Sequence, residues 1–340
     1  MPETVLPPRL ERGGTIGIVT PSIPMPAQVP RRFARGVAEL ERLGFEVRLG
    51  ANALGSRGHR SGTIEERIAD LHELFADPAV DAVLCAIGGF NSNSLLEELD
   101  YDLIREHPKV FVGYSDVTAL HAGIWSQTGL AGCLGPSLLV QFGEFDGVDP
   151  YTWDSWERTL MRAEPAGVLP SSDSWTDEHL AWDEADTRRR ERRPNRGPRT
   201  LREGEIEGPI AAGNLTTLLA LAGTRFWPDL DGALLCLEDD HNADVAILDR
   251  MLTPLRQLGV FEQVAGLALG RFTTASDLAP GSALDQVILE TTRGFDFPIA
   301  ADLDFGHTDP MLCLPWGVRA RLEAGDEVRL SLVEPAVSER

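Results

Sequence analysis

Lysine is almost absent from this chain of 340 residues, in which Lys109 is the only one. A P-loop needs a lysine directly after its glycines, so the sequence excludes nucleotide hydrolysis by that route. A Schiff-base or serine–lysine mechanism would have to use Lys109. The sequence also has no G-x-G-x-x-G turn after a predicted strand, which disfavours a flavin or dinucleotide protein.

Long hydrophobic runs are absent too, and cysteines are few. No apolar run approaches the ~20 residues that span a bilayer, and residues 1–12 contain no apolar leader, so we expect a cytoplasmic protein that does not enter membranes. The cysteines lie in or beside apolar runs, at no metal-binding spacing, so we expect buried free thiols, no metal and no cofactor. They are Cys85, Cys133, Cys236 and Cys313.

Acidic residues outnumber basic ones, and the net charge is −22 with a pI near 4.7. This charge argues against a nucleic-acid polymer as a partner, because its phosphate backbone would be repelled. The length is typical of about two domains. A hydrophobic content of 43% is sufficient for packed cores.

The first part of the chain alternates between strand and helix patterns. Predicted strands at 15–20, 45–49 and 80–87 are separated by predicted helices at 31–43 and 63–75. This alternation indicates right-handed βαβ units and a parallel sheet. Active sites in such sheets gather at the carboxyl ends of the strands.

Composition and pattern divide the chain into three parts. Residues 1–150 form the predicted N-terminal α/β domain, and residues 208–340 form a second α/β region that ends in a predicted β-hairpin. Residues 151–207, rich in Trp, Asp, Glu and Pro, are predicted to be a long connection between the two. Its arginine run at 188–196 is typical of a solvated loop, although loops this long are often functional.

Ser115 stands where a strand pattern turns into a helix pattern. An apolar run ends at Gly113, and a helix-type run begins at Asp116. This is the position of a nucleophile elbow, in which the serine hydroxyl lies at the carboxyl end of a strand with helix amides behind it. The alternative is that Ser115 only caps the helix, because serine is a favoured capping residue.

A nucleophilic serine needs a base, and the base needs a carboxylate to orient it. Lys109 lies six residues before Ser115 on the same predicted strand, which puts it about 20 Å away. The base must therefore be a histidine. His307 directly follows a predicted strand, and Glu238 ends another that is otherwise apolar. Local sequence leaves rivals open: Asp239 or Asp240 as the carboxylate, His241 as the base, or His307 as a plain loop residue. The other histidines, His121 among them, fall mostly in polar helix or loop contexts and are expected to be solvated.

Five short motifs occur in order along the chain. They are residues 86–93 (AIGGFNSN), 111–118 (FVGYSDVT), 213–215 (GNL), 237–239 (LED) and 306–308 (GHT). In this combination the chain resembles the LD-carboxypeptidase family of serine peptidases. The resemblance implies a flavodoxin-like parallel-sheet domain, a smaller C-terminal α/β domain of the swivelling β/β/α type, and a homodimer.

The same resemblance implies roles for individual residues. Ser115 matches the nucleophile, Glu238 the orienting carboxylate and His307 the base. The backbone amides of Gly89 and Asp116 match an oxyanion hole. Amides beside the nucleophile and in a Gly-Gly turn can approach a developing negative charge closely.

The turn after Gly89 and the tryptophans of the connection suggest a branch of the family. Phe90 and Asn91 make this turn longer than is typical of murein tetrapeptide carboxypeptidases, and it resembles the branch that contains the microcin C immunity peptidase. Trp182 and Trp175 could stack on a nucleobase, although such residues also pack a loop onto its own domain. Asn214 and Arg271 are further candidate substrate contacts.

We therefore expect a serine carboxypeptidase that cleaves an amide at the C-terminal end of a peptide, with a peptidyl-adenylate compound as substrate. The alternative within the family is removal of the terminal D-Ala from murein tetrapeptide. A non-catalytic binding module of similar α/β layout is the rival from another class, and it would have no need of Ser115, Glu238 and His307.

Overall fold

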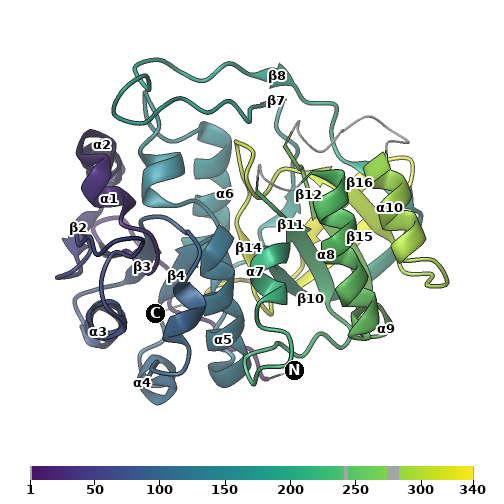
Figure 1. Ribbon diagram of the computed structural model, residues 1–340, viewed down its shortest axis with the longest axis horizontal. Helices are drawn as coiled ribbons and strands as arrows, with labels where there is room; N and C mark the ends of the chain where they lie inside the picture. Colours follow the sequence, from purple (N-terminus) through teal and green to yellow (C-terminus); the bar gives the residue numbers. More distant parts are fainter. Residues whose placement is uncertain (1, 241–243, 274–282, 340) are drawn as a thin grey trace.

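The computed structural model describes residues 2–240, 244–273 and 283–339. Two β-sheets lie side by side, with helices packed against both (Figure 1). None of the helices in the described part of the chain is long and apolar enough to cross a membrane.

The first sheet has the strand order β2-β1-β3-β4-β5, extended at the β5 edge by β14. Its first five strands are parallel, and β14 is antiparallel. This order is the flavodoxin-like one, so the predicted fold class is confirmed. The strands are β1 (Thr15–Val19), β2 (Glu46–Leu49), β3 (Ala82–Cys85), β4 (Val110–Gly113), β5 (Cys133–Leu134) and β14 (Leu314–Pro315).

Helices cover this sheet, and two of their starts are informative. Helix α3 begins with a capping box in which Thr63 and Glu66 bond each other's backbone amides, as its sequence predicts. Helix α5 begins at Thr118, two residues later than predicted, because a 3-10 turn at Ser115–Val117 precedes it. The helices are α1 (Met25–Gln28), α2 (Pro30–Arg42), α3 (Ile64–Ala76), α4 (Tyr101–Glu106), α5 (Thr118–Thr128) and α6 (Pro150–Leu160).

The second sheet has the order β6-β16-β15-β10-β11-β12-β13-β9. Strands β10 to β13 are parallel, and β15 and β16 form the predicted hairpin. The strands are β6 (Gly167–Leu169), β9 (Arg199–Arg202), β10 (Gly204–Asn214), β11 (Leu234–Glu238), β12 (Gly266–Gly270), β13 (Ile299–Leu303), β15 (Arg319–Ala324) and β16 (Val328–Leu332). Helices α7 (Leu215–Leu219), α8 (Val245–Gln257), α9 (Val260–Gln263) and α10 (Ala283–Thr291) accompany them.

The connection between the halves is more ordered than its sequence pattern predicts. Helix α6 occupies its start and packs on the first half, where the Trp156 ring lies 5.4 Å from the Phe142 ring. Asp149 caps this helix and Pro150 opens it, a helix start signal that the composition of the segment does not show. Strands β6 and β9 join the second sheet, and β7 (Ser174–Trp175) pairs with β8 (Arg193–Pro194).

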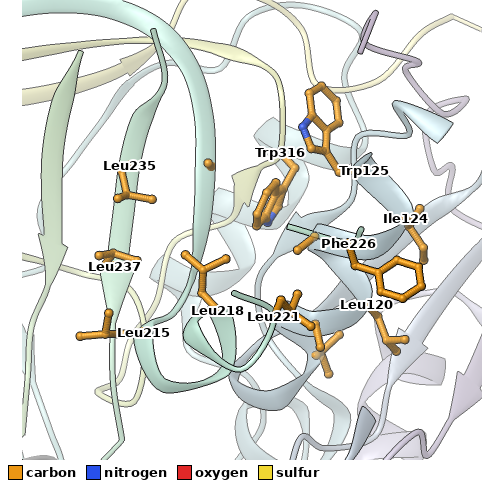
Figure 2. Packing of buried hydrophobic residues seen from close by; sticks show 14 of the residues in the cluster. Leu120, Ile124, Trp125, Leu215, Leu218, Leu221, Phe226, Leu235, Leu237 and Trp316 are labelled. Atoms are coloured by element: carbon orange, nitrogen blue, oxygen red, sulfur yellow. The ribbon is translucent and has the colours of Figure 1, made fainter. Parts of the chain in front are cut away.

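The two halves share one hydrophobic core. Figure 2 shows Leu120, Ile124 and Trp125 of α5 facing Leu218 and Phe226 of the second half. In addition, β14 of the second half completes the first sheet. Side chains that come from different halves are therefore held against each other by packing as well as by their own contacts.

Candidate active site

Ser115 lies at the sharp turn that the sequence predicts. It directly follows β4 and Tyr114, and its φ is +62°, a left-handed conformation that non-glycine residues adopt at a cost. A Cβ on Gly88 would lie 3.0 Å from the Ser115 Cβ. The loop after β3 therefore packs tightly against the turn and helps to hold this conformation.

The structure brings the three predicted side chains together. His307 Nε2 lies 3.1 Å from Ser115 Oγ, and His307 Nδ1 lies 2.5 Å from Glu238 Oε2. Glu238 is the last residue of β11, and His307 follows β13. Because a carboxylate only accepts hydrogen bonds, Nδ1 carries the proton and Nε2 of the neutral ring is free to accept from the serine hydroxyl.

Electrostatics around His307 favour its charged form. Burial alone would lower the pKa of His307, but the charge and hydrogen bond of Glu238 outweigh it, with help from Asp240 and Asp239, and the pKa is raised above its ordinary value. Glu238 itself is fully buried. A Cβ on Gly306, whose φ is +99°, would lie 2.6 Å from the Glu238 Cβ, so only glycine allows this approach.

The turn at Gly89 is fixed beside Ser115. Gly89 has a φ of +146°, and a Cβ there would lie 2.3 Å from Ser22 Oγ. Ser22 Oγ accepts from the amide of Phe90 at 2.9 Å, while Asp116 Oδ2 accepts from the amide of Asn91 at 2.9 Å. Within the part of the chain that the structure describes, the amides of Gly89 and Asp116 donate to no protein group.

The side chain of Arg67 forms hydrogen bonds that hold this turn. Its buried guanidinium donates to the Pro21 carbonyl at 2.6 Å and to Asn91 Oδ1 at 2.7 Å. The side-chain amide nitrogen of Asn91 is buried and has no partner among the described residues. Phe90, in contrast, is 80% exposed. Of the two predicted substrate contacts on the turn, Phe90 thus points into solvent, and Asn91 is half-buried.

Comparison with known proteins identifies the family. Residues 16–135 match the LD-carboxypeptidase N-terminal domain, and residues 207–322 match the LD-carboxypeptidase C-terminal domain. The chain belongs to the LD-carboxypeptidase family. The resemblance carried by the five motifs is confirmed.

Relatives named for two different roles are similar to this chain. The microcin C7 self-immunity protein of Escherichia coli is 34% identical over 96% of this chain and 95% of its own length. The probable murein peptide carboxypeptidase of Bacillus subtilis is 32% identical over 98% and 95%. A solved structure of the immunity protein in complex with aspartyl sulfamoyl adenosine has a TM-score of 0.90 and 34% identity, and covers 98% of this chain and 100% of that one.

Two of the predicted substrate contacts are engaged by protein groups. Asn214 caps α7 through Oδ1, and its Nδ2 donates to Asp239 Oδ1 at 3.2 Å. Arg271 is buried, and its guanidinium donates to Asp304 Oδ1 at 2.6 Å and to Asn195 Oδ1 at 2.7 Å. Contact of either side chain with a substrate therefore stays a prediction.

The two tryptophans of the connection differ in their surroundings. Trp175 is buried between guanidinium groups, with Arg193 and Arg271 5.3 and 5.0 Å from its ring, which is the setting of a packed residue. Trp182 is half-buried, with Arg32 4.5 Å from its ring. Because Arg32 lies in the first turn of α2, which follows β1, Trp182 stands at the same sheet edge as Ser115.

Other ionisable residues have structural places. The ammonium group of Lys109 bonds the carbonyls of Asp77 and Val80, and burial lowers its pKa to about 8. His121, expected to be solvated, is instead buried, and its Nε2 bonds the Gly113 carbonyl at 2.9 Å. Burial lowers the pKa of His121 to about 4, so it stays neutral. The rival base His241 lies outside the described residues.

The sequence did not indicate the residues that hold the turn at Gly89 and the segment that carries His307. Ser22, Arg67 and Gln141 carry no motif of their own, and each acts on residues far away in sequence. These three residues left no signal in the sequence. The burial of His121, in contrast, could have been predicted, because this histidine recurs with apolar residues at helical spacing. No group of three His, Cys, Asp or Glu side chains among the described residues could hold a metal ion.

Proposed function

We propose that this LD-carboxypeptidase family member is a serine hydrolase in which Ser115 attacks the carbonyl carbon of an amide at the C-terminal end of a peptide. As Oγ bonds to carbon, its proton moves to His307 Nε2, which lies 3.1 Å away. Glu238 holds the Nδ1 proton and stabilises the imidazolium that forms. This pair of contacts is the observation that carries the proposal.

The amides of Gly89 and Asp116 are the proposed donors to the developing oxyanion. Support comes from two features: neither amide has a protein acceptor among the described residues, and Asp116 Oδ2 ties the turn to the elbow. Preorganised donors of this kind contribute about 3 kcal/mol each to transition-state stabilisation. His307 then protonates the leaving nitrogen, and a water molecule activated by the same imidazole hydrolyses the ester on Ser115.

The proposed substrate is a peptide whose terminal acidic residue is joined through an amide-type bond to an adenylate-like group. Two observations support it. The fold is similar to that of the immunity protein solved with aspartyl sulfamoyl adenosine, and the half-buried ring of Trp182 lies at the same edge of the first sheet as Ser115. Murein tetrapeptide is the second candidate, because a relative named for murein peptides is nearly as similar at 32% identity.

One experiment separates these readings. The protein and its Ser115→Ala variant are incubated with a murein LD-tetrapeptide and with aspartyl sulfamoyl adenosine that carries a short peptide, and products are identified by mass spectrometry. Serine-dependent cleavage of the nucleotide compound alone supports the first substrate, and cleavage of the tetrapeptide alone supports murein recycling. Cleavage of neither, with tight binding of either one, would support a binding module instead.

The assembly and the compartment are two further parts of the proposal. We propose a homodimer that works in the cytoplasm, supported by the family resemblance and by four free cysteines that are all buried. Light scattering coupled to size-exclusion chromatography tests the first point. A mass of 37.1 kDa in solution would contradict the dimer.

A further inference from the structure

The arginine run of the connection makes ion pairs rather than a free basic patch. Four of its arginines are 36 to 75% exposed, and each pairs with one carboxylate. These pairs are Arg188–Glu178, Arg189–Asp146, Arg192–Asp149 and Arg193–Asp177. Arg190 is different, because its side chain is 16% exposed and pairs with two carboxylates, Glu144 at 2.5 Å and Asp309 at 2.6 Å.

Asp309 is one of two points at which the connection contacts the segment that carries His307. The other is Asp304, which accepts from Ser172 and Asn195. Asp309 is buried and lies two residues after His307. Its Oδ2 accepts from Arg190 Nη2 at 2.6 Å, and its Oδ1 accepts from Gln141 Nε2 at 2.9 Å. Its backbone exchanges two hydrogen bonds with Thr176, at 2.8 and 2.9 Å. Side chain and backbone of Asp309 are thus both held, largely by residues of the connection.

The same contacts reach the serine side of the active site. Gln141 also interacts with Tyr114, the residue before Ser115, because the Gln141 side chain acts against the burial that raises the pKa of Tyr114. The Tyr114 ring packs 5.1 Å from the imidazole of His307. These contacts join Arg190, through Asp309 and Gln141, to Tyr114. Tyr114 precedes Ser115 in the chain, and its ring packs against His307. Figure 1 shows the connection, with β7 and β8, passing along one edge of both sheets.

We propose that Arg190 and Asp309 are positioning residues, which set the place of His307 against Ser115 when the connection is docked. The proposal rests on the proposed function of Ser115 and His307. Loss of Arg190 leaves the buried carboxylate of Asp309 without its cation, whereas Glu144 keeps an ion pair with Arg32 at 3.8 Å. An unpaired buried charge is costly. The backbone between His307 and Asp309 then moves to bring the carboxylate toward water, which displaces the imidazole.

The test compares arginines of one run. Arg190→Gln removes the buried pair, and Arg190→Lys keeps one charge near Asp309. Arg189→Gln and Arg192→Gln are matched controls, because they remove exposed pairs of the same connection. The rate of Ser115 modification by a fluorophosphonate probe is measured well below the unfolding temperature. In that step Oγ bonds to phosphorus, fluoride leaves, and the Oγ proton passes to His307 Nε2, so no natural substrate is needed.

A second measurement follows the histidine itself. The proton on His307 Nδ1, in its 2.5 Å contact with Glu238, is expected as a far-downfield proton resonance. It is assigned by its disappearance in Glu238→Gln. This signal reports the position of the imidazole, which a general loss of stability would not change in the molecules that remain folded.

The expected result is a rate lowered about 10- to 100-fold by Arg190→Gln, the cost of a small displacement of reacting groups. Arg190→Lys recovers part of the rate, Asp309→Asn lowers it in the same direction, and the downfield resonance shifts only in these variants. The controls stay within about twofold of the unmodified protein, as for exposed ion pairs. Equal rates and an unshifted resonance in Arg190→Gln and Arg189→Gln would overturn the proposal. Labelling that does not depend on Ser115 would instead refute the proposed function, and the resonance alone would then decide the role of Arg190.

Discussion

The active edge and the connection lie side by side but are held by different forces. The active edge, defined as Gly89, Ser115, Asp116, Glu238 and His307, is built from close backbone approaches and buried hydrogen bonds. Within the connection, residues 151–207, the arginine run is held mainly by ion pairs, most of them exposed. Single changes should therefore be severe at the active edge, whereas changes to the exposed, ion-paired arginines of the connection should be mild and sensitive to salt.

Glu238→Gln should have the largest effect at the active edge. The amide keeps the size of the side chain but removes the charge that fixes the tautomer of His307, and hydrolysis should fall on the order of 10³- to 10⁴-fold. The loss should also change the pH profile. The pKa of His307 is raised mainly by Glu238 against the effect of burial. Without the carboxylate the pKa falls, the imidazole becomes neutral at lower pH, and the acid limb moves down. Rates measured between pH 5 and 9 check this, and an acid limb that stays in place or moves up would contradict it.

Gly89→Ala should lower hydrolysis by about 100-fold, the cost of misplacing reacting groups. Its Cβ would lie 2.3 Å from Ser22 Oγ at a φ of +146°, so the turn must move and its amide with it. Gly325→Ala is the matched control, because nothing lies within 4 Å of a Cβ there. Steady-state kinetics of both variants test the comparison. Equal activities would mean that the Gly89 amide takes no part in the reaction.

Asp116→Asn should lower kcat about tenfold with little change in KM. This loss is smaller than the loss expected when one oxyanion donor is removed outright. The amide keeps one oxygen that can accept from the amides of Asn91 and Ser92, but a neutral acceptor holds the turn less firmly. Asp100→Asn, at an exposed helix cap, is the control. A loss confined to KM would indicate a role in substrate binding instead.

Trp182→Ala should separate the two candidate substrates. Loss of one stacking partner costs ~1–3 kcal/mol, so cleavage of the nucleotide compound should fall roughly tenfold while tetrapeptide cleavage stays nearly unchanged. Trp175→Phe alters a buried residue of the same connection and should affect both substrates alike. Equal losses for both substrates in Trp182→Ala would remove the argument for base stacking.

The smallest effect is expected from salt. Raising the ionic strength screens the exposed pairs of the connection, so trypsin should cleave after Arg188 and Arg189 a few-fold faster, while hydrolysis at the active edge changes little. Peptide mapping over time measures this. Tryptic cleavage that is independent of salt would mean that the ion pairs do not dock the connection.

The same contrast explains what could be predicted from sequence. Ser115, Glu238 and His307 each lie at or after the carboxyl end of a strand with a clear apolar pattern, so topology alone brings them to strand ends. The parallel sheet follows from the alternation of strand and helix patterns, whereas its flavodoxin-like order was implied by the resemblance to the family. Their mutual distances needed the three-dimensional structure, because they depend on how two halves pack.

Other features left no local signal. Arg190 and Asp309 are 119 residues apart, and an ion pair has no periodicity that would show which carboxylate an arginine meets. Helix α6 was overlooked because its polar surface resembles the loop around it, although Trp156 is fully buried. The expectation that His121 is solvated was wrong because it rested on the polarity of histidine, whereas His121 lies on a helix whose other residues are mostly buried.

The most direct test of the account is to trap the covalent intermediate on Ser115. The protein is mixed with the substrate that it cleaves, quenched with acid within milliseconds to seconds, and digested for peptide mass mapping. The account predicts an acyl group on the peptide that contains Ser115, and none in Ser115→Ala. Product formation with no acylated Ser115, together with normal cleavage by Ser115→Ala, would contradict it.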